Sequence, residues 1–212
     1  MAVIPLRRIG PFEKLLSECT QMAFAEGVAE RNGYGREELP ELLRIAGEVV
    51  RESGRKGSFA SRLIQEESEG KRPVTACVLT LGEGVDSLQD RYREKGDMTA
   101  VYMTEVISNE ILMKSYAAYD RMLTETSKYR IEAFLFPGSS KDCPLSDTEK
   151  IVTLLSAPVR CLTSFCMVPK KSVAFYAYLT EDKEKECRSI CETCSRKDCR
   201  HRREGKGQEE KK

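Results

Sequence analysis

Histidine, tryptophan, net charge and long apolar runs are all scarce in this chain of 212 residues. Its single histidine, His201, excludes histidine-rich metal sites and most Ser-His or Cys-His catalytic arrangements. With 35 Lys+Arg against 34 Asp+Glu, the net charge of +1 argues against a strongly basic nucleic-acid-binding protein. The longest apolar runs, 133–136 and 173–179, are far shorter than the roughly 18–20 residues of a membrane span. Residues 1–10 contain no apolar segment of signal-peptide length, so we expect a cytoplasmic protein without nucleic-acid or membrane partners.

Cysteine, in contrast, is abundant, with nine residues in two groups. An odd number cannot pair completely into disulfides, which fits the reducing cytosol. Five cysteines are scattered along the chain and are expected to be small buried apolar side chains: Cys19, Cys77, Cys143, Cys161 and Cys166. The other four lie close together near the C-terminus and need a different explanation.

These four cysteines have the spacing Cys187-x3-Cys191-x2-Cys194-x4-Cys199. On a helix the first three would share one face, and a return of the chain could bring the fourth to the same point. Four thiolates in so short a segment suit an iron–sulfur cluster or a tetrahedral zinc ion. The spacing alone leaves iron–sulfur, zinc and a metal-free or disulfide state open.

The distribution of apolar residues predicts both helices and strands. Helical spacing is found over 11–27, 38–53, 84–94 and 97–124, and again after Ser146, which forms an S-x-x-E capping box with Glu149. Strands are expected over 58–65, 74–81, 131–136, 158–167 and 172–180, the last two as a hairpin. This order favours an α+β fold with a twisted antiparallel sheet flanked by helices. We expect one domain over 1–181 and a charged tail over 182–212 that carries the cysteine cluster.

Several short segments, taken in order, resemble the activation domain of cobalamin-dependent methionine synthase. Residues 162–173 contain Ser-aromatic-x-Met-x-Pro-x-x-Ser-Val and lead into the aromatic strand Phe175-Tyr176-Ala177-Tyr178. Upstream, Phe136-Pro137-Gly138 is followed by Cys143-Pro144, and Thr80-Leu81-Gly82 ends an earlier strand. The resemblance covers roughly residues 74–180.

The resemblance implies binding of S-adenosylmethionine and a part in reductive remethylation of cobalamin. The implied ligand-binding residues are Pro137, Gly138, Ser139, Lys141, Tyr176 and Tyr178. Two positions differ from the family pattern: Phe134 stands where the family has an Arg that would hold the ligand's carboxylate, and Ser139 stands where it has a Tyr. Lys141 is the loop cation that could take over from the missing Arg. The plain alternatives are that Pro137-Gly138 is only a turn and that the two tyrosines only pack.

The chain has no cobalt-ligating histidine motif, so cobalamin would be carried by a partner. We therefore expect a stand-alone accessory protein that acts in trans in the reactivation of cobalamin-dependent methionine synthase or a related corrinoid methyltransferase. The cysteine cluster, if iron–sulfur, could deliver the electron. Two alternatives remain open: an iron–sulfur reductant for corrinoid proteins that does not bind S-adenosylmethionine, and a non-enzymatic interaction module stapled by zinc.

Overall fold

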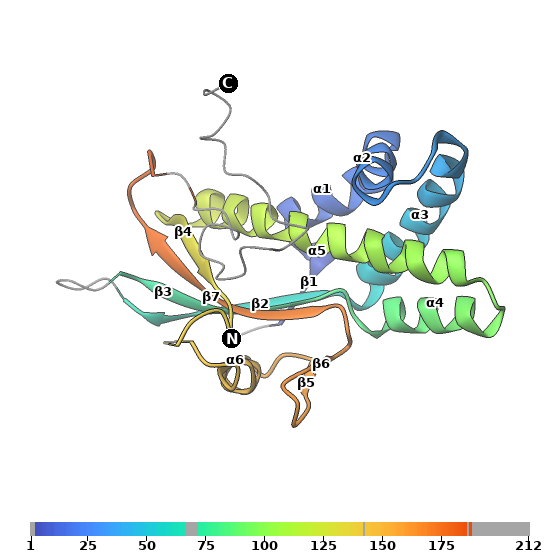
Figure 1. Ribbon diagram of the computed structural model, residues 1–212. Helices are drawn as coiled ribbons and strands as arrows, with labels where there is room; N and C mark the ends of the chain where they lie inside the picture. Colours follow the sequence, from blue (N-terminus) through green and yellow to red (C-terminus); the bar gives the residue numbers. More distant parts are fainter. Residues whose placement is uncertain (1–2, 67–71, 142, 186, 188–212) are drawn as a thin grey trace, which may run out of the picture.

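An antiparallel sheet lies at the centre of the structure, a computed structural model that describes residues 3–66, 72–141, 143–185 and 187 (Figure 1). Its five strands lie in the order β1-β2-β3-β7-β4, with every neighbouring pair antiparallel. The strands are β1 (Ile4–Pro5), β2 (Ser58–Gln65), β3 (Val74–Thr80), β4 (Arg130–Leu135) and β7 (Ser172–Thr180). A separate short pair consists of β5 (Arg160–Cys161) and β6 (Met167–Val168).

Helices flank both sides of this sheet (Figure 1), which confirms the predicted α+β class. On one side lie α1 (Gly10–Glu18), α2 (Met22–Asn32), α3 (Leu39–Lys56), α4 (Glu83–Glu94) and α5 (Met98–Thr126). On the other side lie α6 (Asp147–Leu155) and the β5–β6 pair. Short 3-10 turns are found at Leu6–Arg8 and Arg36–Glu38. Within the described residues, no helix combines the length and the apolar content that crossing a membrane requires.

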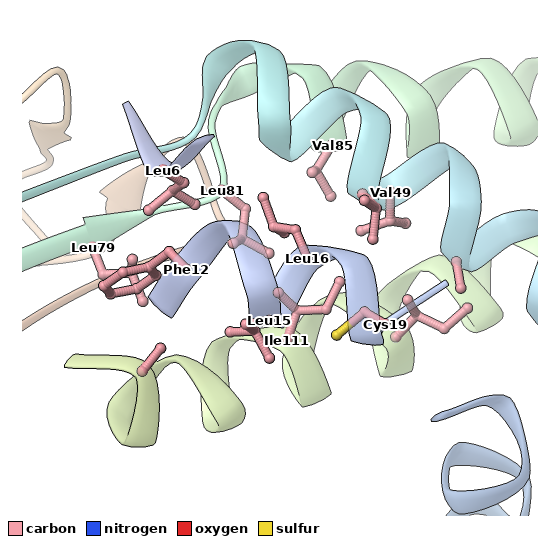
Figure 2. Close-up of a cluster of buried hydrophobic side chains, with 14 of the residues drawn as sticks. Leu6, Phe12, Leu15, Leu16, Cys19, Val49, Leu79, Leu81, Val85 and Ile111 are labelled. Atoms are coloured by element: carbon pink, nitrogen blue, oxygen red, sulfur yellow. The ribbon is translucent and has the colours of Figure 1, made fainter. Parts of the chain in front are cut away.

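The alternation of side chains along β7 divides the core in two. Phe175, Ala177 and Leu179 join a large core beneath α1–α5, whereas Ala174 and Tyr176 belong to a smaller cluster beneath α6. Figure 2 shows part of the large core, where α1, α3, α5 and β3 meet through side chains that include Phe12, Leu15, Leu16, Val49, Leu79 and Ile111. In the smaller cluster the sheet presents small residues to α6, among them Ala60, Ala76 and Ala174.

Most predicted elements are found, but the helix expected over 11–27 is divided into α1 and α2. The chain leaves the helix after Glu18, where the Thr20 hydroxyl donates to the Ser17 carbonyl at 2.8 Å and Gln21 is extended (φ −94°, ψ 154°). Since apolar spacing continues across this break, the sequence pattern did not reveal it. The long helix α5 begins as expected at Asp97, whose carboxylate accepts from the Ala100 N–H at 2.9 Å.

The hairpin predicted between strands 158–167 and 172–180 is wrong. β7 pairs with β3 on one side and β4 on the other. Within 158–167, only Arg160–Cys161 and Met167 are in strands, and they pair with each other across a turn in which Phe165 has a φ of 61°. Because β7 has apolar side chains on both faces, a central position in the sheet buries more of its surface than a local hairpin would.

The helix predicted after Ser146 is confirmed as α6, but its capping box is not formed. Ser146 itself has helical backbone angles (φ −62°, ψ −16°), and its side chain makes no capping hydrogen bond. Asp147 and Glu149 in the first turn instead place negative charge at the helix N-terminus, where the helix dipole favours it.

Candidate functional site

The predicted ligand loop is a tight turn between β4 and α6. The Ser139 N–H donates to the Phe136 carbonyl at 2.9 Å, and the Gly138 N–H donates to the Cys143 carbonyl at 2.8 Å. Gly138 has a φ of +83° and follows Pro137, which is the residue order that a type II turn requires. Pro137-Gly138 is therefore a turn. It leaves Lys141 exposed and Ser139 half-buried.

Phe134 lies on the opposite side of the sheet from α6. It is paired with Ala177, which belongs to the large core, and its ring centroid lies 5.1 Å from that of Tyr116 and 5.6 Å from that of Phe175. Position 134 thus fills an aromatic cluster. A ligand on the α6 side has no carboxylate partner at this position.

Tyr176 and Tyr178 share the α6 side of β7, because they alternate with Phe175 and Ala177. The Arg72 guanidinium lies over the Tyr178 ring, 4.8 Å from its centroid. One face of Tyr178 is therefore already covered by a cation. Tyr176, in contrast, borders a hollow in the surface.

Polar and ionisable side chains gather around Tyr176 at the start of α6. Burial raises the pKa of Cys143 to about 11, the charge of Asp147 adds to the rise, and Lys150 opposes it. Partial burial likewise raises the pKa of Tyr176, and Asp147 and Cys143 add to that rise. Lys150 Nζ donates to Asp147 Oδ1 at 2.7 Å. At neutral pH Cys143 and Tyr176 are uncharged, so neither is prepared to act as a nucleophile.

The hollow beside Tyr176 has a volume of about 350 Å³. Its lining comes from the end of β2, one flank of α6 and β7: Arg62, Leu63, Ile64, Lys150, Leu154 and Tyr176. Arg62 is paired with Ala76, and Ala76 with Tyr176, so the three residues form one row across the sheet. Ala76, in the middle of this row, is fully buried beneath α6. Lys150 and Leu154 are four residues apart and so share one face of α6.

Sequence reasoning found Tyr176 but missed Arg62, Lys150 and Leu154. The i, i+4 spacing of Lys150 and Leu154 within a predicted helix was a usable signal. Arg62 could not be found in that way. Its place opposite Tyr176 depends on the pairing of β2 with β3 and of β3 with β7, which brings together residues more than 100 positions apart.

Other segments that carry the family resemblance hold the strands together. The Ser172 hydroxyl is hydrogen-bonded to the Thr80 hydroxyl at 2.8 Å and to the Pro169 carbonyl at 2.7 Å. The Gly82 N–H in turn donates to the Thr80 hydroxyl at 3.0 Å. These residues serve the junction between β3 and β7. On the α6 side, the resemblance includes the turn at Gly138, Cys143-Pro144, Met167 and Tyr176.

The chain beyond β7 is held against β4 by ion pairs. Lys185 pairs with Glu132 at 3.0 Å, and Arg72 pairs with the same carboxylate at 2.9 Å. Burial opposes ionisation of Glu132, which is 2% exposed, but the hydrogen bond from Lys185 and the charge of Arg72 outweigh it and lower the pKa of Glu132. Lys128 pairs with Glu181 beside it.

The cysteine cluster lies mostly outside the described residues. Cys187 is half-buried and packs against the large core. Cys191, Cys194 and Cys199 are not among the described residues, nor is most of the predicted 182–212 tail. The part of the chain that the structure describes contains no group of side chains suited to a metal ion. The metal site and the boundary after residue 181 therefore stay predictions.

Comparison with known proteins gave a match among solved structures. No protein-family model and no curated protein matches this chain. Among solved structures, the crystal structure of the MetH reactivation domain bound to AdoHcy aligns with 56% of this chain and 42% of its own, at 17% identity and a TM-score of 0.40. The chain thus matches less than half the length of that structure. We assign no ligand from this alignment.

Proposed function

We propose that this protein acts in trans in the reductive reactivation of a cobalamin-dependent methyltransferase, with methionine synthase as the first candidate. In this role it presents S-adenosylmethionine to cobalamin carried by the partner. The methyl group of S-adenosylmethionine then traps the reduced cobalt, which makes an unfavourable reduction effectively irreversible. The reduction requires one electron, and S-adenosylhomocysteine leaves once the methyl group has been transferred.

The observation that carries this proposal is the ordered set of motif residues between 74 and 180, together with where two of them lie. The Gly138 turn leads into α6, and Tyr176 borders a hollow on the same side of the sheet. A volume of about 350 Å³ is within the range of small-molecule sites, about 300–1,000 Å³. The ring of Tyr176 offers a flat surface to an adenine. Phe134 does not contribute to this ligand site, because its ring packs against Tyr116 on the other side of the sheet.

The direct experiment is a recovery assay. Methionine synthase that lacks its own activation domain is oxidised to the cob(II) form, then incubated with a chemical reductant and S-adenosylmethionine. We expect activity to return when this protein is added and to stay low without it. An equal recovery in both samples would exclude the proposed function. Heat-denatured protein serves as the control for non-specific protein effects.

The cysteine cluster separates this proposal from the two alternatives. We propose that Cys187, Cys191, Cys194 and Cys199 hold an iron–sulfur cluster that delivers the electron, with zinc as the competing occupant. Anaerobic purification followed by an absorption spectrum and metal analysis identifies the metal, and calorimetry identifies ligand binding. Iron with ligand binding supports the proposal. Iron without ligand binding favours a corrinoid reductant, and zinc without binding favours an interaction module.

A further inference from the structure

The hollow beside α6 combines an apolar wall with a positive charge that has no ion-pair partner among the described residues. Ile64 and Leu154 form the apolar wall and are 44% and 41% exposed, as side chains at the edge of an open site are. Arg62 is exposed at one end of the hollow. It forms no ion pair with any of the residues that the structure describes. Apolar side chains around a few polar groups are the usual composition of a small-molecule site.

The second cation of the hollow is already compensated. Lys150 Nζ lies 2.7 Å from Asp147 Oδ1 one helical turn away, in an ion pair that an incoming anion would have to share. Among the described residues, Arg62 is therefore the cation of the hollow that could bind an anion without sharing it with a carboxylate. Its planar guanidinium can also bind a carboxylate through two parallel hydrogen bonds, which a lysine cannot do.

The register of the sheet sets the backbone spacing between Arg62 and Tyr176. Arg62, Ala76 and Tyr176 occupy one row across three adjacent strands. Since neighbouring strands are about 4.8 Å apart, the Cα atoms of Arg62 and Tyr176 are separated by roughly 10 Å. A ligand in the hollow that touches both residues needs a flat ring for Tyr176, a carboxylate for Arg62 and an apolar linker against Ile64 and Leu154.

We propose that Arg62 binds the carboxylate of the amino-acid part of a nucleoside–amino-acid ligand whose ring system lies against Tyr176. The choice of S-adenosylmethionine as that ligand rests on the proposed function. Arg62 is thus a specificity-determining residue: it distinguishes a ligand with an amino-acid group from one that has only the nucleoside. It belongs to β2, outside the segments that carry the family resemblance.

Calorimetric titration with two ligands tests this assignment. S-adenosylmethionine carries the carboxylate, and methylthioadenosine has the same nucleoside without the amino-acid part. We expect Arg62→Ala to weaken S-adenosylmethionine binding about tenfold and to leave methylthioadenosine binding unchanged. The matched control is Arg51→Ala, which removes an exposed arginine from α3 on the other side of the sheet and should change neither affinity. Circular dichroism verifies that each variant is folded.

Three results would overturn the assignment: equal S-adenosylmethionine binding by Arg62→Ala and the unaltered protein, equal weakening of both ligands, or no binding of either ligand by the unaltered protein. The recovery assay keeps this failure distinct from that of the proposed function. Recovery with an Arg62→Ala variant of unchanged affinity would reject the role of Arg62 alone. Arg62-dependent binding without any recovery would support that role and reject the function.

Discussion

Replacing Gly82 by alanine should destabilise the protein strongly, for two separate reasons. Gly82 has a φ of +83° and a ψ of 165°, a backbone conformation that residues with a side chain essentially never adopt. Adopting it costs about 1–3 kcal/mol. In addition, a Cβ at this position would lie 2.6 Å from the backbone carbonyl carbon and oxygen of Lys56, at the end of α3. Relieving such an overlap costs typically about 1–3 kcal/mol more.

The expected loss for Gly82→Ala is therefore about 2–6 kcal/mol, against a total stability of about 5–15 kcal/mol for a typical domain. Urea unfolding followed by circular dichroism measures this loss. Two control glycines separate the causes, because neither would meet another atom within 4 Å. Gly33→Ala, at a φ of +74°, should lose about 1–2 kcal/mol from strain alone. Gly47→Ala, inside α3, should gain up to about 1 kcal/mol. A loss at Gly82 no greater than at Gly33 would refute the close approach to Lys56.

Three further predictions concern the burial or exposure of single side chains. Phe175→Ala should lower the free energy of unfolding by about 3–5 kcal/mol, measured in urea, because the ring is 1% exposed; a loss below about 1 kcal/mol would contradict its burial. Glu132 has a lowered pKa, so the stability advantage of the unaltered protein over Glu132→Gln should be full above pH 4.5 and decline as the pH falls below that value, in urea titrations at several pH values. Cys166 is exposed, so its expected burial is wrong, and maleimide labelling of the native protein, read by mass spectrometry, should modify it rapidly. Cys19 and Cys77 should be modified only on unfolding, since burial raises both of their pKa values to about 12.

Local patterns were sufficient where an element's neighbours are close in sequence. β2 and β3 follow each other and pair as a hairpin, and α5 begins at its capping residue Asp97. β7 shows the limit of this reasoning. Its nearest preceding strand offered a plausible hairpin, but pairing with β3, about 100 residues earlier in the chain, buries both of its faces. That preference depends on the whole sheet, so it cannot be predicted from the sequence of β7 or of the preceding strand.

The candidate site divides in the same way. Tyr176 and the Gly138 turn were accessible from short motifs, although the turn proved to be held by its own backbone hydrogen bonds. The sequence alone could not show which face of β4 carries Phe134. The register of β4 shifts between Ile131 and Ala133, and a shift of one residue exchanges the two faces of a strand. Arg62 was missed because only three-strand registry brings it opposite Tyr176.

The most direct test of the proposed function follows the methyl group itself. A partner cobalamin protein in the cob(II) form is mixed with reductant and with S-adenosylmethionine labelled in its methyl group, with or without a stoichiometric amount of this protein. We predict that labelled methylcobalamin forms on the partner only when this protein is present. Equal labelling in its absence, or no labelling in its presence, would contradict a role in reactivation.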